Sequence, residues 1–443
     1  MVFIYHRLKK PSIFDFESVP AQVRKLIYWA KRKWFPNFDY TKIKECDRPV
    51  VKTSTIPGPK GKGVLNDIAI FSLDFYNNRV FAHPEKSYLN YFADADDNMI
   101  LDLNIKGLPL GYNNPLFIKN SFNEENLLAA SNPSLDSSEV FSESSLLLLE
   151  KLQKELSVGN LTKLYPTDLI DDSLNSLVSM NKNFHRNNEK KSVIATIGKD
   201  ITLPDLNLNE TQDEYFSRAA SDVLRSLDEN KDKLLGVVLS PILSSKQGHL
   251  YPTSSFAREI NDYCKNNYIA VIVDETRSYI NSGLVYGFDY WKLPNEPDFV
   301  VLRNESNCNP LILTNSFNAR YVNLLENKKF YTKNLNNSLG LLKYVKEENV
   351  LNQVAENERY VLNQLSECQK YNKDKLLNLR GKGTYTSFDL PTREIRNNFQ
   401  AQVLNSGINL CSVGEKSITM RSTLVFKKNF LDYVKTSINN FSI

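Results

Sequence analysis

The stretch that decides the fold is Ile269-Ala270-Val271-Ile272-Val273-Asp274-Glu275, an apolar run that ends in two acids. Apolar runs of the same kind stand at Leu234–Leu239 and Phe299–Leu302, and an amphipathic segment, Ser254–Asn266, lies between two of them. Short apolar strands that alternate with helices are typical of parallel sheets whose faces are covered by helices. The sequence therefore predicts an α/β protein with a mainly parallel central sheet flanked by helices.

The carboxyl ends of these strands form the predicted ligand-binding edge. Ligands on such sheets bind at this edge, where we expect Ser240, Asp274 and Arg303. An acid in this place suits the ring nitrogen of a cofactor, and a lysine after the following strand would complete a Schiff-base site. The residues after Phe299–Leu302 read Arg303-Asn304-Glu305-Ser306, without a lysine. The sequence thus predicts the scaffold of such a site without its nucleophile.

Composition limits the class of protein. The chain has 443 residues, of which 41% are hydrophobic, which is enough for at least one large core and for two domains. No apolar run approaches the roughly 18 residues of a membrane span, so we expect no membrane insertion. The five cysteines are scattered without a CxxC pair, which favours a reducing compartment, and the four histidines are equally dispersed. We therefore expect no metal site.

Basic residues are concentrated in the first 52 positions. This segment holds 12 Lys or Arg against 5 Asp or Glu, giving +7, so the remaining residues carry −3 of the formal total of +4. Its basic side chains alternate with aromatic ones, a mixture suited to contact with a phosphate backbone or another anionic partner. The candidate contact residues are Arg24, Lys25, Lys31, Arg32 and Lys33. The alternative is a solvated amphipathic helix that packs on the body through its apolar side.

The extreme amino terminus bears on the location of the protein. Met1–Phe14 contains no acid and three Lys or Arg residues, a composition compatible with an organelle-targeting sequence, although Pro11 interrupts any helix early. We expect a mitochondrial protein, and a cytoplasmic one is the alternative.

Pattern and composition divide the chain into four parts. We expect a basic arm at 1–50, the first part of a small β-rich domain at 51–115, a large α/β domain at 116–330 and a terminal α+β domain at 331–443. Asp96-Asp97-Asn98 should form a hairpin turn in the small domain. Further expected elements are strands at Ser192–Ile197 and Ser417–Met420 and helices at Ser144–Leu156, Asp213–Asp228 and Leu341–Leu365.

Three blocks of residues carry a family resemblance. The blocks are Ile56–Pro59 with Gly111–Pro115, Pro241-Ile242 with Val273–Glu275, and Leu379–Thr384 with Gly414–Ile418 and Thr423–Phe426. In them the chain resembles class III, fold-type I, pyridoxal-phosphate-dependent aminotransferases, and within these the 4-aminobutyrate aminotransferases of fungi and animals. The resemblance covers residue 51 to the end and implies the fold-type I architecture, with a large domain around the central sheet and a small α+β terminal domain.

The resemblance also implies that most catalytic positions have changed. The family's Schiff-base lysine falls on Glu305, and a carboxylate cannot form an imine with an aldehyde. The family's phosphate-binding Gly-Ser or Gly-Ala pair falls on Asp171 and Asp172, whose charges would repel a phosphate. A threonine that contacts the phosphate falls on Leu324, and a glutamine of the family falls on Arg277. Together these changes imply a lost cofactor site.

Two family positions keep their residues. Asp274 matches the acid that pairs with the cofactor's pyridinium nitrogen, and Arg421 matches an arginine that binds a substrate carboxylate. A structural role for each is the alternative: Asp274 as an acceptor for amides of a neighbouring loop, and Arg421 as the partner of a buried acid. The family's Phe-His-Gly-Arg motif has only a relic in Phe184-His185-Arg186.

These changes favour a degenerate aminotransferase that does not catalyse, needs no cofactor and serves as a structural or binding subunit of a larger assembly. The basic arm suggests an assembly that contains RNA, such as a mitochondrial ribosome. One alternative is an active pyridoxal-phosphate-dependent 4-aminobutyrate transaminase whose lysine comes from elsewhere, such as Lys292 or Lys328. Another is a regulatory pseudoenzyme that pairs with an active paralogue, since family members resemble obligate dimers.

Overall fold

The computed structural model describes residues 45–69, 80–121, 143–166, 191, 193–208, 210–302, 311–319 and 332–442. The chain divides into two units, Met1–Lys44 and Glu45–Ile443, and all the described residues belong to the second. None of the helices that these residues form has both the length and the apolar character of a membrane span.

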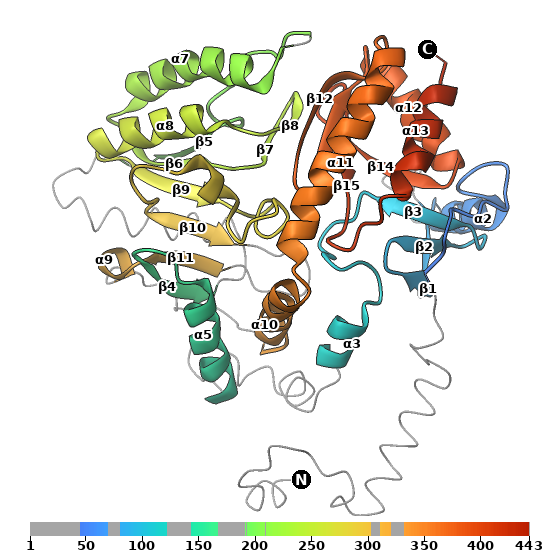
Figure 1. Cartoon of the computed structure of the whole chain (residues 1–443), viewed down its shortest axis with the longest axis horizontal. Helices are drawn as coiled ribbons and strands as arrows, with labels where there is room; N and C mark the ends of the chain where they lie inside the picture. Colours follow the sequence, from blue (N-terminus) through green and yellow to red (C-terminus); the bar gives the residue numbers. More distant parts are fainter. Residues whose placement is uncertain are drawn as a thin grey trace, which may run out of the picture. The chain divides into compact units, whose positions relative to one another are not determined.

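A six-stranded sheet carries the residues from which the fold was predicted (Figure 1). Its strands lie in the order β4-β11-β10-β9-β6-β5. They are β4 (Leu161–Pro166), β5 (Val193–Thr196), β6 (Leu234–Leu239), β9 (Ala270–Asp274), β10 (Phe299–Leu302) and β11 (Leu311–Asn315). Strands β5, β6, β9 and β10 are parallel, whereas β11 is antiparallel to both β10 and β4. The prediction of a mainly parallel central sheet is confirmed.

The strands of this sheet are apolar throughout because both of its faces are buried. Val237 and Val271 point into the main core, which also contains residues of two covering helices. Val238 and Ile272, their neighbours along the strands, belong to a separate cluster on the other face. Since successive side chains of a strand point to opposite faces, a strand that is covered twice has no polar alternation.

Two helices lie over the first face of the sheet (Figure 1). They are α7 (Gln212–Asn230) and α8 (Ser254–Asn266). Each begins after a threonine whose hydroxyl accepts a backbone amide of the first turn: Thr211 from Glu214 and Thr253 from Phe256. Between the helices, the rings of Phe216 and Phe256 pack with centroids 4.9 Å apart. Both helices lie where the sequence predicted them, within two residues at each end.

A seven-stranded sheet joins the two ends of the described chain. Its strand order is β1-β2-β3-β14-β15-β13-β12. The strands are β1 (Ala82–Tyr88), β2 (Tyr91–Asp94), β3 (Met99–Leu103), β12 (Leu377–Lys382), β13 (Tyr385–Asp389), β14 (Ile408–Val413) and β15 (Ser417–Arg421). Leu101 of β3 pairs in parallel with Ile408 of β14, so residues 307 positions apart share one sheet. The predicted Asp96-Asp97-Asn98 turn connects β2 to β3.

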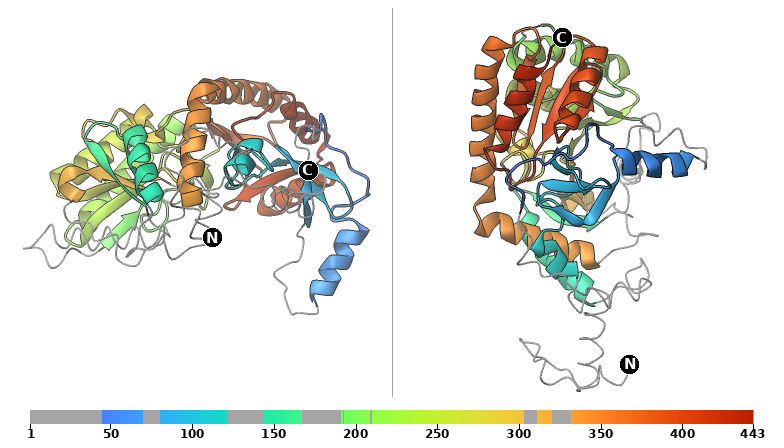
Figure 2. Two further views of the ribbon diagram at one scale, coloured as in Figure 1. Left: turned by 90° about the horizontal axis from the view of Figure 1, so that it is seen from below. Right: turned by 90° about the vertical axis from the view of Figure 1, so that its right-hand side faces the viewer.

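Three helices pack against this second sheet. They are α11 (Val350–Tyr371), α12 (Arg393–Asn405) and α13 (Phe430–Asn440), and Figure 2 shows α11 running along one side of the strands. The helix before them, α10 (Thr332–Glu347), is separated from α11 by Asn349, whose φ of 51° lies in the left-handed region. The prediction that Leu341–Leu365 is helical is confirmed, except that the helix is interrupted between Glu347 and Val350.

The remaining elements stand between those named above in the chain. They are α2 (Pro59–Ala69), α3 (Pro115–Ser121), α5 (Glu143–Leu156), α9 (Ser316–Ala319), the 3₁₀ helix η5 (Gly287–Trp291) and the hairpin β7 (Leu243–Ser245) with β8 (Gly248–Leu250). The hairpin follows β6 in the chain and reaches across to β15 of the other sheet. It is the element that brings residues of both sheets into one site.

Candidate functional site

Asp274 is the last residue of β9 and lies next to Ser240, the residue that follows β6. Its Oδ2 accepts a hydrogen bond from Ser240 Oγ at 3.2 Å, and its Oδ1 accepts the backbone amide of Thr276 at 2.9 Å. The guanidinium of Arg277 lies 3.9 Å from Oδ2. Two hydrogen-bond donors and one cation of the chain itself thus face this carboxylate.

Glu275, the second acid of the motif, points away from solvent and is fully buried. Its carboxyl group accepts hydrogen bonds from Ser278 Oγ at 2.5 Å, from Gly287 N at 3.0 Å and from Phe288 N at 2.7 Å. Burial, and to a smaller extent the nearby charge of Asp274, raise the pKa of Glu275 to about 7 against the lowering effect of these bonds. Glu275 thus ties the loop after β9 to the start of η5 and has a structural role.

A small cleft with a cavity volume of about 30 Å³, open to solvent, lies between the loop after β9 and the ends of β13 and β15. Its polar lining comes from both sheets and consists of Thr276, Asn281, Thr384, Tyr385, Arg421 and Ser422. Two of the buried atoms here, Thr384 Oγ1 and Arg421 Nε, have no hydrogen-bond partner. Since most buried polar atoms are paired, this cleft has unused capacity for a polar ligand.

Arg421 donates from Nη2 to Nε2 of His249, at 3.2 Å. The two side chains also share Tyr385: its ring centroid lies 5.8 Å from Arg421 Cζ and 5.5 Å from the centroid of the imidazole. Burial, with the positive charges of Arg421, Arg277 and Arg380, holds the pKa of His249 well below its usual value of 6.5. The imidazole is therefore neutral at physiological pH.

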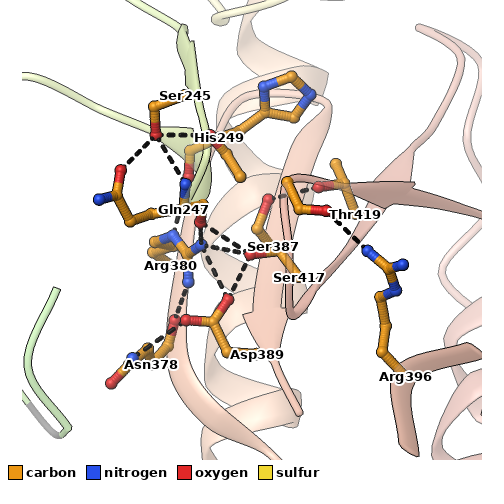
Figure 3. Close-up of polar contacts among 12 residues, drawn as sticks. Ser245, Gln247, His249, Asn378, Arg380, Ser387, Asp389, Arg396, Ser417 and Thr419 are labelled. Carbon is orange, nitrogen blue, oxygen red and sulfur yellow. Dashed lines mark hydrogen bonds and ion pairs between the residues drawn. The ribbon is translucent and has the colours of Figure 1, made fainter. Parts of the chain in front are cut away.

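Arg380 holds the backbone of the hairpin that carries His249 (Figure 3). Its side chain donates from Nε to His249 O at 2.8 Å and from Nη2 to Gln247 O at 2.8 Å, to Asp389 Oδ1 at 3.0 Å and to Ser417 Oγ at 3.0 Å. Figure 3 shows the imidazole of His249 turned away from this network. One buried guanidinium thus connects the hairpin to three strands of the second sheet, β12, β13 and β15.

The structure brings together only some of the site residues that the sequence suggested. Asp274 and Arg277 form one cluster, and Thr276 between them lines the same cleft as Arg421. The other predicted positions lie outside the described residues: Asp171, Asp172, Glu305, Leu324, the relic Phe184–Arg186, Lys328 and the arm residues Arg24, Lys25, Lys31, Arg32 and Lys33. Lys292, the other candidate lysine, is exposed at the end of η5 and does not line the cleft.

His249 is the site residue that the sequence reasoning missed. Dispersed histidines without ligand spacing predict no metal site, and a lone histidine in Gly248-His249-Leu250 carries no local signal. Its role arises because β8 crosses to β15, where Arg421 stands 172 positions later in the chain.

The resemblance implies a pyridoxal phosphate ring whose nitrogen Asp274 would hold. A protonated ring nitrogen needs a carboxylate that is free to accept it and whose charge is not already balanced. At Asp274 the ring nitrogen would compete with the hydroxyl of Ser240 as a hydrogen-bond donor. The positive charge of Arg277 would also repel a protonated ring. The described residues therefore disfavour a protonated cofactor ring at this place, whereas the positions of its lysine and phosphate lie outside the described residues.

Curated proteins similar to this chain are 4-aminobutyrate aminotransferases. The enzyme of Schizosaccharomyces pombe is 23% identical over 467 residues, covering 89% of this chain and 95% of the enzyme. That of Emericella nidulans is 24% identical over 483 residues, covering 92% of each chain. The mitochondrial enzyme of Sus scrofa is 24% identical over 454 residues, covering 88% of this chain and 89% of the enzyme. The similarity is distant but extends over most of the chain.

Solved structures agree on the architecture. A lysine aminotransferase from M. tuberculosis, in the internal aldimine form, superposes with a TM-score of 0.72 at 13% identity and covers 85% of this chain and 98% of its own. Plasmodium falciparum ornithine delta-aminotransferase superposes with a TM-score of 0.68 at 15% identity, covering 86% and 97%. These likenesses show the fold-type I α/β fold. The sequence profile of the family described as aminotransferase class-III matches residues 175–441, and the chain belongs to this family.

Proposed function

We propose that this protein does not catalyse pyridoxal-phosphate-dependent transamination and acts as a structural or binding subunit of a larger assembly. The observation that carries the proposal is the pairing of Asp274, whose Oδ2 accepts from Ser240 and faces Arg277 at 3.9 Å. In this arrangement the acid that would stabilise a cationic ring instead stabilises the protein's own groups.

The segment after β10 supports the same proposal. Between the end of β10 at Leu302 and the start of β11 at Leu311, the chain reads Arg-Asn-Glu-Ser-Asn-Cys-Asn-Pro, without a lysine. The resemblance assigns the Schiff-base lysine to Glu305 in this segment. A carboxylate there removes both the covalent anchor and the proton carrier of transamination.

The basic arm supports the second half of the proposal. Residues 53–443 carry a net charge of −3, whereas the first 52 residues, which include the arm, carry +7. Electrostatic attraction to a polyanion therefore belongs to this basic segment. We propose an assembly that contains RNA, such as a mitochondrial ribosome, and hence a mitochondrial location.

Absorbance spectroscopy of the full chain with added pyridoxal phosphate tests the loss of catalysis. We expect no near-visible band that borohydride abolishes, and no amino transfer from 4-aminobutyrate to a 2-oxo acid. A borohydride-sensitive band would overturn the proposal, and its loss in Lys292→Met or Lys328→Met would then identify the lysine of an active enzyme. An active fungal relative serves as the positive control.

Mass measurement of the native complex tests the role in an assembly. We expect the chain to sediment with RNA and several other proteins, and ribonuclease to release it. A free homodimer would argue against the assembly, and a heterodimer with an active aminotransferase would instead support a regulatory pseudoenzyme.

A further inference from the structure

A second pocket lies at the opposite ends of the strands that line the cleft. Strand β13 contributes its first residue, Tyr385, to the cleft and its last, Asp389, to this pocket, and β15 likewise contributes Arg421 to the cleft and Ser417 to the pocket. Four residues of extended strand separate the two sites, a distance of roughly 13 Å. The pocket has a cavity volume of about 280 Å³. This volume is near the lower end for ligand pockets and about twice that of a cavity that holds benzene.

The polar side chains in the floor of the pocket are bonded within the protein (Figure 3). Asp389 accepts hydrogen bonds at Oδ1 from Arg380 and Ser417, and at Oδ2 from Asn378 at 3.0 Å. Gln247 donates from Nε2 to two oxygens of the loop that precedes α7. None of the buried unpaired polar atoms in the described part of the chain belongs to a residue that lines the pocket. The floor therefore offers a ligand no free charge.

The charges at the rim of the pocket balance one another. Lys246 forms an ion pair with Asp205 at 3.0 Å. Glu415 and Lys416 are exposed neighbours in the turn between β14 and β15, carry opposite charges and form no ion pair with a described residue. A site without net charge suits an uncharged ligand. Because Glu415 can accept and Lys416 can donate, the rim also matches the N–H and C=O of a peptide group.

Apolar side chains line the rest of the pocket and continue beyond it. The lining includes Leu206, Leu208, Leu377, Leu390 and Pro391. Leu208 leaves 64% of its surface exposed, the largest fraction among the exposed aliphatic side chains of the described residues. A leucine in water is unfavourable, and a ligand confined to the cavity would leave most of Leu208 uncovered. The surface therefore fits an occupant that is larger than the cavity and places only one apolar group inside it.

We propose that this pocket docks a partner protein of the assembly through an uncharged, extended segment whose leucine-sized side chain enters the cavity. The peptide group of that segment would meet Glu415 and Lys416, and its flanking residues would cover Leu208. An apolar anchor in a preformed pocket is the usual energetic centre of a protein interface. The inference rests on the proposed role as a subunit of an assembly and gives that role a protein contact on the body, distinct from the RNA contact of the arm.

Titration of the full chain with N-acetyl-leucine amide, followed by saturation-transfer NMR of this probe, tests the inference. We expect saturable binding at least about tenfold tighter than that of N-acetyl-alanine amide, whose side chain is three carbon atoms smaller. Isocaproate, an anion with the same apolar group, should bind more weakly than the uncharged probe, because the rim has no net charge to attract it. Absence of binding by the leucine probe, equal binding of the two amides, or tighter binding of isocaproate would overturn the inference.

Two exposed leucines provide a variant and its matched control. Leu208→Gln should weaken binding of the leucine probe about tenfold, because Leu208 lines the pocket. Leu146→Gln should leave it unchanged, since Leu146 lies in α5, is 50% exposed and does not line the pocket. Both side chains are largely in solvent, so both variants should fold. Equal effects of the two substitutions on probe binding would contradict the inference.

Sedimentation of the native complex distinguishes a partner protein from a small molecule. At a salt concentration that weakens the contact of the arm with RNA, we expect Leu208→Gln to leave the assembly more readily than the wild type and Leu146→Gln. If Leu208→Gln binds the probe poorly but sediments as the wild type does, the pocket belongs to a small apolar molecule and the docking is overturned. A wild-type protein that never sediments with an assembly would instead contradict the proposed function, so the two failures are distinguishable.

Discussion

Arg380 in β12 donates a hydrogen bond from Nε to the carbonyl oxygen of His249 in β8, over 2.8 Å. Through this bond a buried arginine of the seven-stranded sheet holds the hairpin that follows β6 of the other sheet. Because the side chain of His249 contacts Arg421, the position of the cleft depends on a group that does not line it.

Replacing Arg380 with methionine is expected to lower the free energy of unfolding by about 3–5 kcal/mol, because the carboxylate of Asp389 would remain buried without its partner. Urea denaturation followed by circular dichroism measures the change. Arg225→Met is the matched control, since Arg225 pairs with Asp222 at the surface at 3.6 Å and should contribute less than about 1 kcal/mol. Equal losses in the two variants would contradict a structural role for the buried network.

Glu275→Gln is expected to change how stability depends on pH. The pKa of Glu275 is about 7 in the folded protein and 4.5 in an exposed carboxyl group, so the folded state binds the proton more tightly between these values. The stabilisation of the folded state by this bound proton is therefore fully present below pH 4.5 and is lost as the pH rises through 7. The loss amounts to roughly 3 kcal/mol over this window.

Urea denaturation of wild type and Glu275→Gln at pH 5, 6, 7 and 8 checks this prediction. The difference in unfolding free energy, variant minus wild type, should increase with pH across the series, because glutamine has no charge to desolvate. A difference that stays constant over the four pH values would show that Glu275 titrates as an ordinary acid.

Gly383→Ala is expected to destabilise the protein by several kcal/mol. Gly383 has a φ of 58°, and a Cβ there would lie 1.8 Å from the carbonyl oxygen of Asn281, a backbone atom that cannot move aside cheaply. Gly63→Ala is the control: its Cβ would meet nothing within 4 Å in helix α2, so it should leave stability unchanged or raise it by up to about 1 kcal/mol. Thermal unfolding compares the two, and a midpoint for Gly383→Ala at or above that of the wild type would refute the predicted clash.

Replacing Lys31, Arg32 and Lys33 with glutamine is expected to weaken RNA binding uniformly across sequences. If all three contact phosphates of a single strand, the slope of log affinity against log salt should fall by about 2. Filter binding over a series of salt concentrations measures it. Substitution of the exposed lysines Lys163, Lys199 and Lys233 with glutamine is the control. An equal effect on the slope there would show that RNA binding is not specific to the arm.

The structure also sets where the arm can be removed. Glu45 accepts a hydrogen bond from the amide of Asn90 at 2.7 Å, and Val50 forms a bridge with Met99, so these residues belong to the folded body. A deletion of residues 1–44 is therefore the matched test of RNA binding, whereas a deletion of 1–50 would also remove body contacts. Undiminished co-sedimentation of the shorter deletion with the assembly would reject the role of the arm.

The parallel sheet was predictable because the pattern that indicates it lies within each strand. Strands buried on both faces read as continuous apolar runs, and the acid at the end of Ala270–Asp274 marks where β9 meets solvent. The same reasoning did not predict the break between α10 and α11, where a single left-handed residue, Asn349, interrupts the helical pattern. Asparagine tolerates that conformation without requiring it, so its identity does not specify the break.

From the sequence alone came the α/β class, the helices that cover the sheet and the place of Asp274 and Arg277 at its carboxyl edge, since period and strand ends depend on near neighbours in the chain. The tertiary structure alone decided that Arg421 contacts His249 and that Arg380 holds the same hairpin, across 172 and 131 positions respectively. Such contacts form only when two separately buried sheets pack together, and no local pattern of residues records which side chains then face each other.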